Sequence, residues 1–218
     1  MINYNLHQNE ALESIARSII GQYDPNLLHK PCAIPVEEIM EQVYGLTVEF
    51  HHIRNNGRIL GETIFEDTTV AIYEHKDNEG YKLIPVKAGT IIIDASLLHR
   101  RSYGRFRFTC AHELAHWVID RQYFKQLGEK AAAMTSETAK DMSRKTLKSS
   151  NTNDIIERQA NRMASRILMP KCTLKNEFYR VSSDRLIFDN VGYLANQYSV
   201  SKEAMKIRLK EMGLIQLP

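Results

Sequence analysis

The sequence predicts an α+β protein in which a small, twisted, mostly antiparallel sheet packs against helices and is followed by a helical tail. Three observations lead to this prediction. Apolar residues recur at helical spacing near the N-terminus, β-branched and aromatic runs separated by turn residues fill residues 46–94, and helical spacing returns after Gly104. With 218 residues, the chain can form one large domain, or one domain with a small appendage.

Two amphipathic helices are expected before the sheet. In the first, within residues 1–20, the apolar residues at helical spacing are Leu12, Ile15, Ala16 and Ile19. In the second, which Pro35 opens and Gly45 ends, they are Val36, Ile39, Met40 and Val43. Each helix therefore presents one apolar stripe to a common core.

The strands are expected between Leu46 and Asp94. Five short runs have the composition of strands, namely LTVEF, ETIF, TTVAIY, KLIPV and TIIID. Turn residues at 55–57 and 77–80 separate some of these runs. Short connections favour antiparallel neighbours, so the sheet is expected to be mostly antiparallel.

Two more helices are expected in the second half of the chain. One runs from Thr109, its predicted N-cap, to about Arg121, and the other runs from about Asn153 to Met169, where Pro170 stops it. Residues 125–150 between them are rich in Lys, Ser, Thr and Ala, and we interpret them as a mobile insertion with room for one short exposed helix.

Composition places the chain among soluble globular proteins and excludes the disordered and membrane classes. Hydrophobic residues make up 43% and charged residues 25%, and no apolar run approaches the length of about 20 residues that a membrane span needs. The N-terminus lacks the basic start and apolar core of a signal peptide. Three cysteines are an odd number without metal-knuckle spacing, so a reducing, cytoplasmic location is expected. The net charge of +3 is too small to predict a nucleic-acid binder by itself.

The string FTCAHELAHWVID carries the most informative residues, His112, Glu113 and His116. Two histidines at i and i+4 lie on one helix face, so both imidazoles can reach one metal ion, while Glu113 can reach a water beside it. The alternative is a surface helix with two solvated histidines. Apolar neighbours on most sides of the helix argue against that alternative.

A catalytic zinc site needs a third protein ligand, for which Glu157 is the preferred candidate. All eight histidines lie at or before position 116, so the third ligand is expected to be a carboxylate. Asp120 lies too far along an unbroken helix from His112, and it is kept as a partner of a ligand or as a surface charge. Glu157 borders an apolar helix face, where a carboxylate needs a cation, although a nearby arginine could also supply one. Asn161, one turn later, could bond the outer nitrogen of a ligand histidine.

The segments RFRFTCAHELAHWV and ERQANRMASRILMP together resemble the ImmA/IrrE family of zinc metallopeptidases. In the second segment the matching residues are Glu157, Ala160, Asn161, Ala164, Leu168, Met169 and Pro170, whereas Met163, Ser165 and Ile167 differ conservatively. The resemblance covers roughly residues 35–212. It implies a zincin-like, gluzincin-type fold, Zn²⁺ bound by His112, His116 and Glu157, and Glu113 as the catalytic carboxylate. The 40 residues between His116 and Glu157 exceed the expected family spacing, and the surplus falls in the 125–150 insertion.

Two domains are expected on this basis: a zincin-like metallopeptidase domain at residues 1–180 and a small helical tail at 181–218. The tail reads as two short helices, the second starting near Ser201 and ending at Gly213, and it is similar to the helix-turn-helix-like tails of family members. Acidic residues partly balance its lysines, so protein docking or a structural role is favoured over DNA binding. The segment 99–107 has four arginines, which suit a solvated connection, an acidic partner or nucleic acid, with the solvated connection favoured.

The function expected from the resemblance is limited proteolysis of a helix-turn-helix transcriptional repressor by a cytoplasmic zinc endopeptidase, in a bacterial stress or mobile-element switch. The alternative is a metal-binding regulatory module that binds a repressor or DNA without hydrolysing it. Such a peptidase also needs an oxyanion stabiliser. Tyr179 and Tyr193 are the main candidates for that role, with Arg180 and Tyr103 as further ones.

Overall fold

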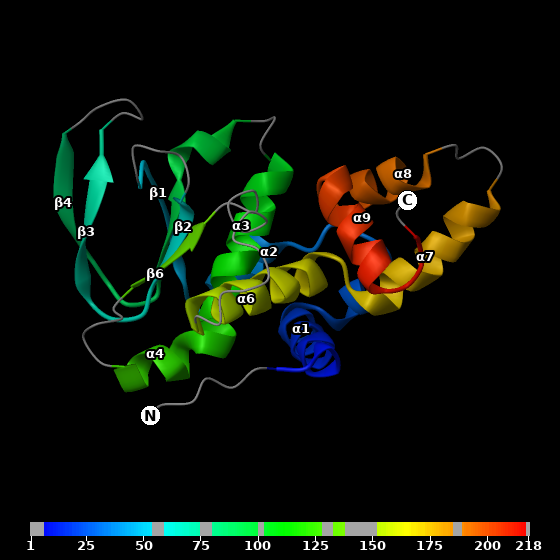
Figure 1. Cartoon of the computed structure of the whole chain (residues 1–218), viewed down its shortest axis with the longest axis horizontal. Helices are drawn as coiled ribbons and strands as arrows, with labels where there is room; N and C mark the ends of the chain where they lie inside the picture. The colour runs from blue at the N-terminus through cyan, green and yellow to red at the C-terminus, as the bar shows by residue number, and fades with distance from the viewer. Residues whose placement is uncertain are drawn as a thin grey trace.

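A computed structural model describes residues 7–53, 59–74, 80–99, 103–127, 133–137, 152–184 and 189–216 (Figure 1). The helices of the first part are α1 (Asn9–Tyr23), α2 (Val36–Gln42), α3 (Tyr103–Ala115) and α4 (Arg121–Leu127). The later helices are α6 (Thr152–Leu168), α7 (Lys171–Ser183), α8 (Asn190–Gln197) and α9 (Lys202–Glu211). None of the helices in the described ranges is long and apolar enough to cross a bilayer.

The strands form two sheets, and with the helices they confirm the predicted α+β class. The strands are β1 (Thr47–His51), β2 (Ile59–Ile64), β3 (Thr68–Tyr73), β4 (Tyr81–Val86), β5 (Thr90–Asp94) and β6 (Ala133–Glu137). The larger sheet has the order β1-β5-β2-β6, with β1 and β5 parallel and the other pairs antiparallel. Strands β3 and β4 form a separate antiparallel hairpin. The sheet is therefore mostly antiparallel, as predicted.

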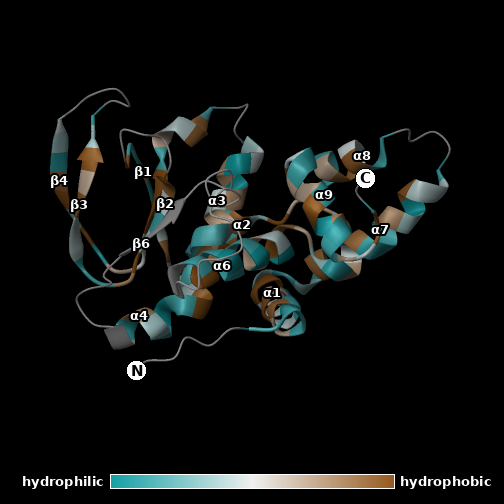
Figure 2. Ribbon diagram, viewed as in Figure 1, coloured by the Kyte–Doolittle hydropathy of each residue, from teal (hydrophilic) through white to brown (hydrophobic). Residues whose placement is uncertain are grey.

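Strand β5, in the middle of the larger sheet, is buried on both faces, which explains its uninterrupted apolar run. On β5, Ile91 and Ile93 point into the main core with α3, whereas Ile92 points into a second core against the β3–β4 hairpin. All three side chains are fully buried. Because successive residues of a strand face opposite sides, a strand covered on both sides buries every position and is mostly apolar. Figure 2 shows hydrophobic colour along the strands of this region.

Strand β6 corrects part of the prediction for the 125–150 insertion. Residues 133–137 form a strand that the prediction did not include, and it pairs antiparallel with β2, with Thr63 opposite Met134. Its sequence, AMTSE, is poor in strand-forming residues, so the strand depends on the edge that β2 offers. Residues 128–132 and 138–150 of the predicted insertion lie outside the described residues.

The helix of the HExxH motif begins earlier than predicted. It starts at Tyr103, and Thr109 lies inside it, where the Thr109 hydroxyl donates to the Arg105 carbonyl oxygen at 3.1 Å. Thr109 is therefore not the N-cap. Inside a helix, a threonine hydroxyl often bonds the carbonyl oxygen four residues earlier. A threonine in the sequence therefore fits the inside of a helix as well as its N-cap.

The C-terminal helices α7, α8 and α9 lie at the end of the molecule opposite the sheet (Figure 1). The buried residues Leu194, Tyr198 and Leu209 of this region belong to the same apolar cluster as the cores of α3 and α6. Gly104 of α3 lies against the turn between α8 and α9, where an added Cβ would come within 3.3 Å of the Ser201 backbone nitrogen. Helix α7 spans the predicted boundary at residue 180, and the division into two domains stays a prediction.

A buried ionic network joins α9 to the N-terminal helix and to α6. Arg208 is 1% exposed, and its guanidinium approaches the Glu13 carboxylate at 2.7 Å and donates to the Met169 carbonyl oxygen at 3.2 Å. Arg166 of α6 approaches the same Glu13 at 3.4 Å. The network thus fixes three segments that are far apart in the sequence.

We expect Arg208→Met to lower the free energy of unfolding by about 2 to 3 kcal/mol, because the thioether fills the volume but leaves the Met169 carbonyl without its donor and Glu13 with Arg166 as its remaining partner in the network. Urea denaturation followed by circular dichroism measures the change. The matched control is Lys210→Met on the exposed side of the same helix, for which a change within about 0.5 kcal/mol is expected. Equal midpoints for the two variants would contradict a stabilising role for the network.

Candidate metal centre

The HExxH residues and Glu157 lie where α3 and α6 pack together in the middle of the molecule (Figure 1). His112, Glu113 and His116 come from the end of α3 and the turn after it, and Glu157 comes from the first half of α6. All four side chains are buried. The apolar faces of the two helices are thus the reason that these polar groups meet, because burying those faces brings the helices together.

Three of these side chains direct their donor atoms to one point. The Nε2 atoms of His112 and His116 lie 2.9 Å apart, and their rings are nearly perpendicular, at 81°. The Glu157 carboxylate oxygens lie 3.2 Å from His112 Nε2 and 3.4 Å from His116 Nε2. An ion pair with Arg158, Arg162 or Arg166 was the alternative for Glu157. Arg166 pairs with Glu13 and Glu211, and Glu157 itself faces the two imidazoles.

This donor set fits a metal ion. Ligands at zinc distances of about 2.0–2.1 Å in a tetrahedral arrangement lie about 3.3 Å from one another, close to the separations found here. Within the described part of the chain, neither Glu157 oxygen has a hydrogen bond of good geometry, although both are buried. Two imidazoles and one carboxylate leave a fourth position open, as catalytic zinc sites do, and the same donors also suit other divalent transition metals.

The outer nitrogens of both histidines are held by polar side chains. His112 Nδ1 lies 3.2 Å from Asn161 Oδ1, and His116 Nδ1 lies 2.7 Å from Asp120 Oδ2. In each pair Nδ1–H donates to the oxygen, which leaves the Nε2 lone pair directed inward. The helix is not unbroken at this point, because His116–Asp120 forms a π-helical turn. Asp120 was expected to be either the partner of a metal ligand or a surface charge. Because Asp120 is fully buried, the structure supports the first role, with His116 as the ligand.

We expect Asp120→Ala and Asn161→Ala each to weaken zinc binding by about 10- to 100-fold, because the imidazoles lose the groups that orient them. Competition with a chromophoric chelator measures the dissociation constants. Gln159→Ala is a matched control for Asn161, since Gln159 is a buried amide on the same helix that bonds the His7 backbone instead. Zinc affinities equal to that of the wild type in both variants would contradict an orienting role.

The carboxylates beside the two histidines favour a positive charge in this cluster. Burial by itself would raise the pKa of Glu157, but contacts with the His112 and His116 imidazoles outweigh it and lower the pKa to about 2. Burial would lower the pKa of His116, whereas Asp120 and Glu157 together raise it well above its usual value. Without a metal ion, the site therefore retains a proton on His116 between its two carboxylate neighbours.

Zinc affinity is expected to rise with pH. A metal ion must displace the proton on His116, so the proton competes with zinc below the raised pKa of His116 and stops competing above it. Dissociation constants measured between about pH 6 and about pH 8 should fall, and binding should release protons, as calorimetry in buffers of different ionisation enthalpy would detect. A zinc affinity that does not change with pH, together with no release of protons on binding, would contradict a proton on His116.

Glu113 faces strand β2 of the sheet. Its carboxylate Oε2 accepts a hydrogen bond from the Thr63 hydroxyl at 2.7 Å, and its side chain lies over Gly61. Sequence reasoning identified Glu113 but neither of these partners. A glycine inside an apolar strand was the one available signal, because it marks a place where another group approaches the backbone closely.

The proposed oxyanion candidates lie on or near the surface, outside the His-His-Glu cluster. Tyr179 is on α7 and Tyr193 on α8, and both are exposed. Arg180 pairs with Glu177 at 2.6 Å and donates to the Tyr193 hydroxyl at 3.0 Å. Tyr103, in the first turn of α3, is half exposed and stacks on Phe106. An oxyanion role for any of these residues stays a prediction.

The basic segment 99–107 is partly helical instead of a solvated connection. Residues 103–107 form the start of α3, and Arg107 is buried, donating to the Ile34 carbonyl oxygen at 2.6 Å beside Glu37. Residues 100–102, with two of the four arginines, lie outside the described residues. Arg107 thus has a structural partner and is unavailable to an acidic ligand.

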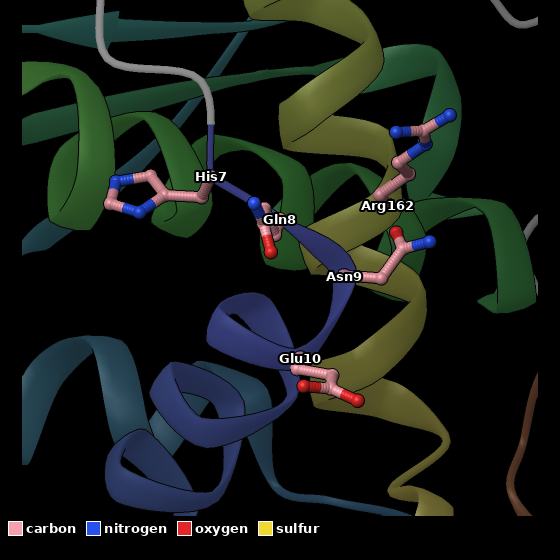
Figure 3. Close-up of a pocket in the computed structure, with 5 residues that line it drawn as sticks. All are labelled: His7, Gln8, Asn9, Glu10 and Arg162. Carbon is pink, nitrogen blue, oxygen red and sulfur yellow. The ribbon is translucent and has the colours of Figure 1, made fainter.

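A surface hollow of about 420 Å³ lies at the start of α1 (Figure 3). Figure 3 shows side chains of the α1 start around it and Arg162 contributed by α6. The lining residues are His7, Gln8, Asn9, Glu10 and Arg162. None of them is a candidate site residue, so the hollow is separate from the His-His-Glu cluster.

Comparisons with known proteins point to a peptidase family. The family model of Peptidase_M78, described as the IrrE N-terminal-like domain, matches residues 60–210. Among solved structures, a transcriptional regulator from Mycobacterium tuberculosis is similar, with 14% identity and a TM-score of 0.49 over 95% of this chain. The chain spans 47% of that protein. A search of curated proteins found no match.

Proposed function

We propose that this chain, which belongs to the Peptidase_M78 family, is a zinc-dependent endopeptidase whose metal ligands are His112, His116 and Glu157 and whose general base is Glu113. The observation that carries the proposal is the convergence of the two imidazoles and the Glu157 carboxylate on one buried point, with Glu113 adjacent in the same helix. A purely structural metal site has no need of a second carboxylate beside it. The family itself points to a metallopeptidase, which agrees with this arrangement.

The proposed mechanism assigns one task to each group. When bound, zinc supplies Lewis acidity that activates a water molecule and polarises the scissile carbonyl group. Asp120 and Asn161 hold the His116 and His112 rings so that Nε2 faces the site. Glu113 accepts the proton of the attacking water and later delivers it to the amine nitrogen of the leaving peptide.

The substrate is proposed to bind as an extended strand along the edge of the larger sheet. Strand β2, which contacts Glu113, is paired on both sides, with β5 and with β6. Among the described strands, β6 therefore forms the edge of the sheet on this side, next to the strand that faces the metal centre. Backbone pairing along such an edge holds a peptide extended, as an endopeptidase needs.

A helix-turn-helix transcriptional repressor is the proposed substrate, and the cytoplasm is the proposed location. The resemblance to ImmA/IrrE peptidases supports the substrate class. Cys32, Cys110 and Cys172 are all free, which agrees with a reducing compartment. The tail helices α8 and α9 are proposed to dock protein in preference to DNA, because Lys202 of α9 is already paired with Asp189 at 2.6 Å.

The experiment that tests the proposed function is incubation of the zinc-loaded protein with a helix-turn-helix repressor that copurifies with it, followed by mass spectrometry of the fragments. A single cut that disappears when a chelator removes the metal, and returns when zinc is added back, is the expected result. A stable complex with an intact repressor would instead favour a regulatory module that binds without hydrolysis. A mobility-shift assay over a range of salt concentrations tests DNA binding separately.

A further inference from the structure

We propose that Gly61 and Thr63 of strand β2 are positioning residues for the Glu113 carboxylate, an inference that rests on the proposed peptidase function. Glu113 lies on a helix and its two partners lie on a strand about 50 residues earlier, so only the packing of α3 on the sheet brings them together. The strand would act on the reaction through Glu113 and not by touching the substrate.

Thr63 holds one oxygen of the carboxylate. Its hydroxyl lies 2.7 Å from Glu113 Oε2 and 3.1 Å from the Glu113 carbonyl oxygen, and both side chains are fully buried. A threonine hydroxyl has a single hydrogen, and the shorter contact and the negative charge favour donation to the carboxylate. This bond restricts rotation of the carboxylate about its last side-chain torsion.

Gly61 supplies the space for the other oxygen. A Cβ at position 61 would lie 2.4 Å from Glu113 Oε1 and 2.8 Å from its Cδ, so no larger residue fits while Glu113 keeps this conformation. The pairing of β2 with β6 shifts register between Ile59 and Gly61, and irregularities of this kind, such as a β-bulge, adjust the direction of nearby side chains. The glycine and the register shift together let the carboxylate lie against the strand backbone.

The sheet makes this support rigid. Thr63 is paired with Ile91 of β5 on one side and with Met134 of β6 on the other. A strand hydrogen-bonded on both sides cannot shift without breaking its ladder, so the carboxylate is held by a fixed element and not by a loop. Catalytic groups need such support, because small displacements of a proton acceptor reduce the rate strongly.

The test compares Thr63→Val, which keeps the shape and removes the hydroxyl, with Thr63→Ser, which keeps the hydroxyl. Two probes are used with the zinc-loaded proteins: hydrolysis of fluorescein-labelled casein, and calorimetric binding of acetohydroxamate, which binds zinc and offers an O–H to a neighbouring carboxylate. For Thr63→Val we expect kcat to fall by about 10- to 100-fold with KM unchanged, and acetohydroxamate to bind about tenfold more weakly. Thr63→Ser should stay within about threefold of the wild type.

Zinc content and thermal unfolding separate positioning from a structural role. Zinc stoichiometry should be the same in all variants, because Thr63 contacts none of the three metal-binding side chains directly. Thr90→Val is the matched control, since Thr90 is a buried threonine of β5 that precedes Ile91 and so faces the other side of the sheet. It should leave kcat and acetohydroxamate affinity unchanged. Gly61→Ala should reproduce the fall in kcat, because its methyl group displaces Glu113.

The outcomes distinguish this inference from the proposed function. If the wild-type protein cleaves casein, and Thr63→Val does so equally well and binds acetohydroxamate with the same affinity, the positioning role is wrong while the peptidase function stands. If Thr63→Val loses stability but keeps kcat and acetohydroxamate affinity, Thr63 is only structural and the inference is overturned. If the zinc-loaded wild type cleaves neither casein nor a helix-turn-helix repressor, the proposed function fails and the inference fails with it.

Discussion

Replacing Glu113 with glutamine is expected to lower peptide hydrolysis by roughly 10³- to 10⁴-fold without changing the zinc content of the protein. Glutamine has the shape of glutamate and still accepts the hydrogen bond from Thr63, so the fold around position 113 should persist. The amide cannot take a proton from water, and the reaction therefore loses its general base. Fragment yield over time and metal analysis of the same sample measure the two effects.

Glu62→Gln is the matched control for this variant. Glu62 is a buried glutamate on β2, but it lies between Gly61 and Thr63 and so faces the opposite side of the sheet from Glu113. Its replacement should leave cleavage unchanged. Unaltered cleavage by Glu113→Gln would overturn the mechanism, and loss of zinc from Glu113→Gln would show that Glu113 acts on the metal site itself.

Replacing Glu157 with alanine is expected to weaken zinc binding by at least about 1000-fold, because a direct ligand contributes more than the groups that orient the ligands. The variant also removes the carboxylate that faces both imidazoles at 3.2 and 3.4 Å. Zinc should raise the melting temperature of the wild type but not of this variant, since a ligand stabilises a fold in proportion to the logarithm of its concentration over its dissociation constant.

Glu177→Ala provides the comparison for Glu157. Glu177 is as well buried as Glu157, but it lies on α7 and pairs with Arg180. Zinc affinity should be unchanged in this control, even if the protein is less stable. Full zinc occupancy in Glu157→Ala would require another residue as the third ligand.

Much of the fold followed from local patterns. The strands at residues 47–94 and the helices α1, α2, α6, α8 and α9 appear close to where the apolar periodicity and turn residues place them. Helix α7 was not expected, although Leu174, Phe178 and Val181 have helical spacing, because Pro170 was interpreted only as the end of one helix, whereas it also precedes the first residue of the next. Strand β6 has no comparable signal, and its existence depends on pairing with β2.

The sequence also did not predict that the strands form two separate sheets. The β3 and β4 runs, TTVAIY and KLIPV, have the same composition as those of the larger sheet. What separates them is that their hairpin covers one face of that sheet, with Val70 and Val86 packed near Ile92. Which strands pair with one another depends on how the whole core packs. The sequence of a single strand of five residues does not determine that packing.

For the metal centre, the donor types and their spacing can be read from the sequence. His112 and His116 lie one turn apart on any helix and so share one face of it, and the same holds for Glu157 and Asn161. The contacts between elements depend on tertiary packing: His112 with Asn161, and Glu113 with Gly61 and Thr63. The physical reason is that helical spacing is a property of neighbouring residues, whereas contacts between α3, α6 and β2 arise from burying their apolar faces against one another.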